Sequence, residues 1–142
     1  MGGCLIEGNG SGIPSNGIHS FVPVLVTRNV VRNNGFGGIF VAENSTVTHD
    51  TVNNNAMFGI NAGPWSLVTN NTANENGEDG ISVGERSTVS FNTANDNDQD
   101  GIQAVCPSTI THNRASGNGG DLDIKPIGVG CVVKDNTTGK PQ

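Results

Sequence analysis

The stretch GISVGERSTVSFNTANDNDQD, residues 80–100, decides the fold of this chain, because its pattern returns every 21 residues from residue 17 to residue 118. Gly-Ile pairs and two polar columns carry the repeat. The pairs begin at Gly17, Gly38, Gly59, Gly80 and Gly101. A constant period of this length indicates a stack of similar units, each of which packs mainly on its neighbours.

Each repeat contains three short stretches in which apolar and polar residues alternate, as in β-strands with one buried face. In residues 80–100 the inward positions are Ile81, Val83, Val89 and Ala94. The apolar residues do not recur at the three-and-four spacing of a helix. The sequence therefore predicts an all-β fold, a right-handed parallel β-helix (solenoid) of about six coils.

The two polar columns fit bends between strands, because Asn tolerates left-handed backbone conformations and its amide can hydrogen-bond along a stack. One column reads Asn34, Asn55, Asn76, Asn97 and Asn118, and the other reads Asn29, Asp50, Asn71, Asn92 and Asn113. Leucine-rich repeats have a similar period but need several leucines per unit, and this chain has four in total.

The composition limits both the organisation and the partners. With 142 residues the chain is predicted to be one domain, 1–142, in which 17–118 is regular and 119–142 is a C-terminal coil or cap. A net charge of −6 argues against a nucleic-acid partner, because it leaves no basic stripe to contact phosphates. No apolar run is long enough to span a membrane. The sequence shows no signal peptide. Its first residues resemble the inside of a strand, so we interpret the given sequence as starting part-way through a longer protein.

The pattern Gly-Ile-x-Val, then Ser-x-Val-x-x-Asn-x-Ala-x-x-Asn, resembles the parallel β-helix repeats of the pectate-lyase-like superfamily, and especially its NosD-like repeat proteins. The resemblance covers residues 4–136. It implies a secreted or cell-surface location and an interaction with polysaccharide. The superfamily contains lyases, hydrolases, epimerases and non-catalytic proteins, so the fold alone does not select a function. We expect a non-catalytic module, with a calcium-assisted polysaccharide-active enzyme as the alternative.

The two ends of the predicted solenoid are its weak points, because uncapped ends expose strand edges. Residues 3–9 have the same residue pattern as residues 130–136. We therefore expect each segment to form the second strand of its coil, one at each end of the solenoid. Residues 125–128 are expected to fold over the C-terminal end. The N-terminal end has no evident cap, which favours a homo-oligomer formed through it or a longer parent chain. Cys106 and Cys131 fall on adjacent coils, where a disulfide is feasible, although two free thiols are the alternative.

An acidic bend is the first candidate site. Asp79 and Asp100 occupy one slot in adjacent coils, about 4.8 Å apart, and Asp121 lies roughly in line if Leu122 takes the next position of the Ile column. Stacked carboxylates repel unless a cation or a proton compensates them. Calcium would suit this set, and the two aspartates are the weak catalytic candidates. The alternative is a solvated acidic edge that keeps the protein soluble.

The outer face of the first strand is the second candidate site. Its outward column reads His19, Phe40, Asn61, Ser82 and Gln103, without a carboxylate pair, an arginine or a lysine. Candidate carbohydrate-binding residues on or near this face are Phe40, Phe58, Asn61, Trp65, Ser82 and Gln103.

Two further readings are weaker. A copper site is not expected, because His49 and His112 lie three coils apart. Outward Thr residues on the second strand resemble an ice-binding array, but strands favour Thr by propensity alone, and Leu25 and Leu67 interrupt the rows.

Overall fold

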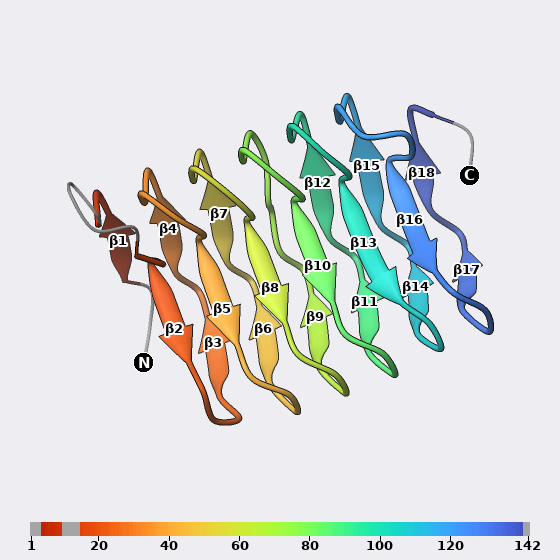
Figure 1. Cartoon of the computed structure of the whole chain (residues 1–142), viewed down its shortest axis with the longest axis horizontal. Coiled ribbons are helices and arrows are strands. Elements are labelled where there is room, and N and C mark those ends of the chain that lie inside the picture. The colour runs from red at the N-terminus through yellow and green to blue at the C-terminus, as the bar shows by residue number, and fades with distance from the viewer. Residues whose placement is uncertain (1–3, 10–14, 141–142) are drawn as a thin grey trace.

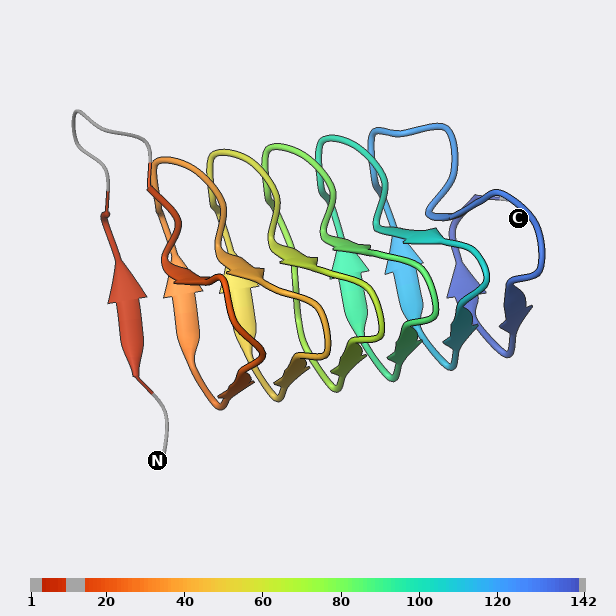
Figure 2. The ribbon, with the colours of Figure 1, turned by 60° about the horizontal axis from the view of Figure 1, so that its bottom comes forward.

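The computed structural model describes residues 4–9 and 15–140, and these residues form the expected right-handed parallel β-solenoid of about six turns (Figure 1). The described residues contain no helix. Successive coils are stacked along one axis, with the two termini at opposite ends (Figure 2). The predicted fold class is therefore confirmed.

Three parallel sheets run along the axis, built from one short strand of successive coils, except that the coil containing Thr72 joins the third sheet only through isolated bridges. The first sheet contains β2 (Ile18–Ser20), β5 (Ile39–Val41), β8 (Ile60–Ala62), β10 (Ile81–Val83), β13 (Ile102–Val105) and β16 (Ile124–Ile127). The second contains β3 (Leu25–Thr27), β6 (Thr46–Thr48), β9 (Leu67–Thr69), β11 (Thr88–Ser90), β14 (Thr109–Thr111) and β17 (Val132–Lys134). The third contains β1 (Leu5–Glu7), β4 (Val30–Arg32), β7 (Thr51–Asn53), β12 (Thr93–Asn95), β15 (Arg114–Ser116) and β18 (Thr137–Thr138), with isolated bridges through Thr72 between β7 and β12.

The core is the stack of inward apolar side chains that the period-2 pattern predicts. Ile81 pairs in register with Ile60 and Ile102, and all three side chains are completely buried. Val89 and Ala94 are buried in the same way on the other two sheets. Like side chains from successive coils therefore lie directly over one another.

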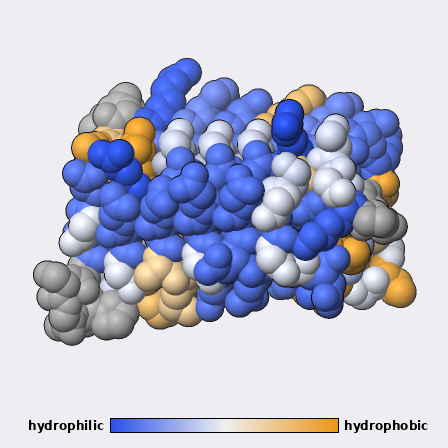
Figure 3. Space-filling model, turned by 90° about the horizontal axis from the view of Figure 1, so that it is seen from above, coloured by the Kyte–Doolittle hydropathy of each residue, from blue (hydrophilic) through white to orange (hydrophobic). Residues whose placement is uncertain are grey.

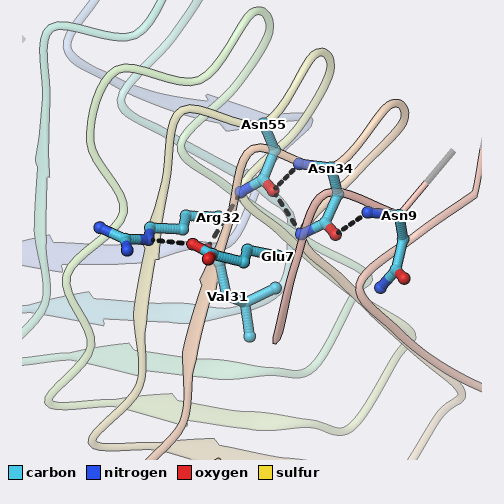
Figure 4. Close-up of polar contacts among 6 residues, drawn as sticks. All are labelled: Glu7, Asn9, Val31, Arg32, Asn34 and Asn55. Carbon is cyan, nitrogen blue, oxygen red and sulfur yellow. Dashed lines mark hydrogen bonds and ion pairs between the residues drawn. The ribbon is translucent and has the colours of Figure 1, made fainter. Parts of the chain in front are cut away.

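Three buried polar ladders run parallel to this core. In the first Asn ladder, Asn55 Oδ1 accepts hydrogen bonds from Asn34 Nδ2 and from the Asn34 backbone N–H, and Asn34 Oδ1 accepts from the Asn9 N–H (Figure 4). The second Asn ladder repeats this geometry. The third ladder is one that the sequence does not predict. The hydroxyls of Ser66, Ser87 and Ser108 each accept the backbone N–H of the Ser one coil earlier, and the Ser45 hydroxyl accepts the Val24 N–H.

The sequence predicted left-handed backbone conformations at the ladder residues themselves. In the structure the left-handed residues are instead those directly before the ladder residues. Examples are Asn54, with a φ of 56° before Asn55, and Trp65, with a φ of 54° before Ser66. These residues turn the chain sharply, so the following amide points into the solenoid. The side chains of these left-handed residues point outward, so the repeat does not require a particular residue type at their positions.

Three predictions about the ends are wrong. The strand near the N-terminus, β1, pairs with β4 in the third sheet and is not a second strand; Gly3, the first residue of that match, lies outside the described residues. Ile124 and not Leu122 takes the Ile column, because the last coil is one residue longer than the repeat. Residues 125–128 do not fold over the end, because β16 continues the first sheet through Ile127.

A disulfide joins Cys106 to Cys131 across adjacent coils, with Cα atoms 4.9 Å apart, whereas Cys4 is free and exposed. Across 4–9 and 15–140 there is no helix of the length and hydrophobicity that a membrane span requires.

Candidate functional site

The outer face of the first sheet presents one straight row of side chains from successive coils. Strand pairing places His19 beside Phe40, Phe40 beside Asn61, Asn61 beside Ser82, and Ser82 beside Gln103. The row then continues to Lys125 on β16. The sequence missed this lysine because Leu122 was assigned to the Ile column, which shifted the last coil out of register.

Aromatic rings cover the N-terminal end of this row. The His19 ring lies 4.2 Å from Phe21 and 4.8 Å from Phe40, measured between centroids. Phe40 in turn lies 6.3 Å from Phe58, which lies 6.0 Å from Phe36. These five rings, called the aromatic cluster below, form a continuous chain of contacts across three coils. Phe58 is its buried base and Phe21 its most exposed member, with relative exposures of 7% and 82%.

Trp65, another carbohydrate candidate, lies apart from the aromatic cluster on the bend between β8 and β9. Its ring is half-exposed, and the Arg86 guanidinium carbon lies 5.6 Å from its centroid. This cation–π contact gives Trp65 a local partner of its own. The structure therefore separates Trp65 from Phe40 and Phe58.

The two aspartates of the acidic bend do meet, and Lys125 joins them. Asp79 Oδ1 accepts the backbone N–H of Asp100 at 3.0 Å, and Lys125 Nζ lies 3.0 Å from Asp100 Oδ2. The Asp100 side chain is buried, so its charge has little access to water. The Lys125 ammonium therefore supplies the compensating charge that stacked carboxylates require.

The electrostatics of this group follow from that geometry. Burial raises the pKa of Asp79, and the neighbouring charges of Asp100 and Glu78 raise it further, against the hydrogen bond donated by Asp100. The hydrogen bond to Asp100 raises the pKa of Lys125, which therefore stays protonated. The arrangement holds a fixed cation beside a carboxyl that releases its proton less readily than a free aspartate.

Asp121, the third proposed calcium ligand, is near enough to raise the pKa of Lys125. It does not continue the Asp79–Asp100 column, because the register of the last coil places Leu122 at that position. Within the described part of the chain, no three His, Cys, Asp or Glu side chains are grouped so that they could hold a metal ion. A calcium ion takes six to eight oxygens, so Asp79 and Asp100 would have to be joined there by carbonyl oxygens or water.

A polar groove of about 540 Å³ runs along the bends between the third and first sheets. Its walls include Asn54, Asn55, Glu75, Asp96 and Asp98. The same side of the molecule is predominantly hydrophilic (Figure 3). The amides of the first Asn ladder are hydrogen-bonded to one another, so the groove offers water the exposed side chains of Asn33 and Asn54 and its acidic groups.

The outward Thr columns of the second sheet are aligned as the repeat predicts. Leu25 and Leu67 interrupt one of them with exposed side chains. His49 and His112 have separate neighbours, Thr48 for the first and Phe91 and Asp135 for the second.

No protein-family model matches this chain, and a search of curated proteins finds no match either.

One buried aspartate interrupts the second Asn ladder. Asp50 Oδ1 accepts hydrogen bonds from the N–H and the Nδ2 of Asn29, as a ladder Asn would. Asp50 Oδ2 stands where every other member has a donating Nδ2, and it has no partner in the described structure. At that position Asn71 donates to the carbonyl of Val47 and to Asn92 Oδ1, so Asp50 Oδ2 faces acceptors. Burial raises the pKa of Asp50 against the opposing hydrogen bonds from Asn29 and the charge of His49.

Replacing Asp50 by Asn is expected to increase the free energy of unfolding at pH 7 by about 2 kcal/mol, because it restores the missing donor. A raised folded-state pKa means that the native protein binds more protons than the unfolded chain. Wild-type stability should therefore fall as the pH rises from about 4 through the folded-state pKa, and Asp50→Asn should remove that slope. Urea unfolding at several pH values measures both effects. The exposed Asp135→Asn serves as control, and equal slopes in the wild type and Asp50→Asn would contradict the assignment.

Proposed function

We propose that the protein is a non-catalytic extracellular module that binds a polysaccharide along the outer face of its first sheet. The aromatic cluster carries this proposal. A set of touching rings that leaves Phe21 82% exposed is an apolar surface of the kind that marks binding sites. The flat, rigid rings suit the apolar faces of sugar units and lose little conformational freedom on binding.

The rest of the row suits a linear polymer. Beyond Phe40, the outward positions Asn61, Ser82 and Gln103 repeat at the strand spacing of about 4.8 Å. Amide and hydroxyl groups can each donate and accept hydrogen bonds, which matches the hydroxyls of a sugar chain. The row is fixed by the backbone pairing of six coils, so the free protein already presents it in line.

The test measures binding of the protein to a panel of neutral and acidic polysaccharides, with and without calcium. Calorimetry or affinity electrophoresis gives the affinity for each polysaccharide. Phe40→Ala should weaken binding of the best ligand about tenfold, because it removes the central ring of the aromatic cluster. Trp65→Ala is the matched control, an aromatic truncation outside the cluster, and should leave affinity unchanged. Equal losses in the two variants, or binding to no polysaccharide, would refute the proposal.

A second candidate is a calcium-assisted polysaccharide-active enzyme that uses the acidic bend. The convergence of Asp79, Asp100 and Lys125 at the far end of the same row favours it. A carboxyl with a raised pKa could donate a proton, while the ammonium holds an acidic sugar. Turnover of a polymer in the same panel, lost in Asp100→Asn and kept in the exposed Asp98→Asn, would replace the first proposal with this one.

A further inference from the structure

The charges of this protein are distributed unevenly around the solenoid. Two sets of bends border the first sheet and join it to the third and second sheets. Ten of the 13 acidic residues lie on these bends, and the other three are Glu7, Asp50 and Asp135. Three of the seven Lys and Arg residues lie on or against the first sheet and its bends, namely Arg86, Lys125 and Lys140. Ten negative and three positive charges give this side a formal net charge of −7, whereas the rest of the chain has +1.

Each of these three cations is already engaged by groups of the protein. Lys125 Nζ lies 3.0 Å from Asp100 Oδ2, and Arg86 Nη1 lies 3.8 Å from Glu85 Oε1. The Lys140 ammonium is hydrogen-bonded to two backbone carbonyls. A carboxylate of a ligand would therefore have to displace one of these partners to pair with a cation on this side.

The row of side chains on the first sheet is itself uncharged along most of its length. From Phe40 to Gln103 it consists of one aromatic ring, two amides and one hydroxyl. A charged group laid on these side chains would lose water without gaining a partner of opposite charge. The hydroxyls of a neutral sugar can instead form hydrogen bonds with the amides and the hydroxyl of the row. The row thus suits an uncharged polymer.

The acidic bends are close enough to the row to act on a ligand there. Glu78 lies four residues before Ser82 of the row, which is at most about 14 Å of extended chain. The Debye length is about 10 Å at 0.1 M salt and about 30 Å at 0.01 M. At low salt, the negative charges therefore repel an acidic polymer on the row and leave a neutral polymer unaffected.

We propose that the polysaccharide bound along the first sheet is neutral, and that polymers of acidic sugars are excluded from this site. This inference rests on the proposed function, because it concerns the same row and the same aromatic cluster. It opposes the second candidate, in which Lys125 would hold an acidic sugar, because Asp100 already compensates that ammonium. The aromatic cluster supplies affinity, and the charges of the bends select against anions.

Pairs of polymers with one backbone and different charge test the selectivity. Dextran, starch and hydroxyethyl cellulose are the neutral members, and carboxymethyl dextran, carboxymethyl starch and carboxymethyl cellulose are the acidic members. In calorimetry at 0.01 M salt, the full chain should bind the neutral member of at least one pair about tenfold more tightly than its acidic counterpart. A rise in salt concentration should narrow this difference by strengthening the binding of the acidic member.

Two charge reversals locate the source of the selectivity. At 0.1 M salt, Glu78→Lys should strengthen binding of the acidic member about threefold and leave the neutral member unchanged. Asp135→Lys is the matched control, because it makes the same change at an exposed residue between β17 and β18, on the bend between the second and third sheets. It should change the affinity for neither polymer.

The outcomes separate this inference from the proposed function. Equal or tighter binding of the acidic member that Phe40→Ala weakens would overturn the inference and leave the proposed function standing. Equal gains in Glu78→Lys and Asp135→Lys would also overturn it, because the charges beside the row would then not select the ligand. Binding that Phe40→Ala does not weaken, or binding to no polymer, would remove the proposed function and this inference with it.

Discussion

Asn76→Ala should lower the free energy of unfolding by at least about 4 kcal/mol, because one side chain completes four buried hydrogen bonds. Asn76 Oδ1 accepts from the backbone N–H and the Nδ2 of Asn55, and its Nδ2 donates to the carbonyl of Val52 and to Asn97 Oδ1. Alanine would leave the Asn55 N–H, one hydrogen of the Asn55 amide and the Val52 carbonyl inside the solenoid without this partner, whereas Asn97 Oδ1 would keep the N–H of residue 76. Each unsatisfied buried group costs about 1–3 kcal/mol, and small domains are stable by only about 5–15 kcal/mol in total.

Urea unfolding followed by circular dichroism measures this loss. The matched control is Asn54→Gly, which removes an exposed Asn next to the ladder at a left-handed position that glycine tolerates. This control should stay within about 0.5 kcal/mol of the wild type. A loss in Asn76→Ala no larger than in Asn54→Gly would show that the ladder does not stabilise the fold.

The Asn ladders and the core could be predicted from the sequence because their members are constrained in every coil. The left-handed bend positions could not, since their side chains face solvent and vary. Each member of the second Asn ladder directly follows a left-handed residue with a φ of 56–59°. These five preceding residues are of four types: Arg28, His49, Asn70, Phe91 and His112. The Ser ladder could not be predicted either, because a Ser between strands is usually an exposed polar residue, whereas these serines are buried.

The candidate site was only half predictable. The column that contains Phe40 and Asn61 follows directly from the repeat, because pairing in the central coils is regular. Lys125 did not follow, since Asp123 enters the position that glycine holds in earlier coils and the last coil gains a residue. The bend absorbs this residue and Ile124 still points inward, but an assignment that is off by one residue places every later side chain of the strand on the wrong face. The ring contacts around His19 depend on Phe21, which lies beyond the end of β2, where the repeat gives no guidance.

The Gly-Ile pairs have a steric explanation that leads to the second large effect. A Cβ added to Gly80 would lie 2.6 Å from Asn97 Nδ2 and 2.7 Å from the carbonyl oxygen of Gly101. Gly101 has the same contact with the next ladder amide, at 2.5 Å from Asn118 Nδ2. The coils up to Gly101 therefore need a glycine where the chain leaves the first Asn ladder, because the next amide and the next backbone fill the space of a side chain, whereas the last coil has Asp123 at this position.

Gly80→Val should consequently destabilise the protein by about 3 kcal/mol or more, since backbone and ladder must both move to admit the side chain. Ser82→Val is the matched control, because it adds the same side chain two residues further along, on the outer face of β10, where strand propensity favours valine. Unfolding in urea should place the control within about 1 kcal/mol of the wild type. Equal stabilities of Gly80→Val and Ser82→Val would mean that the glycine column is not set by this close packing.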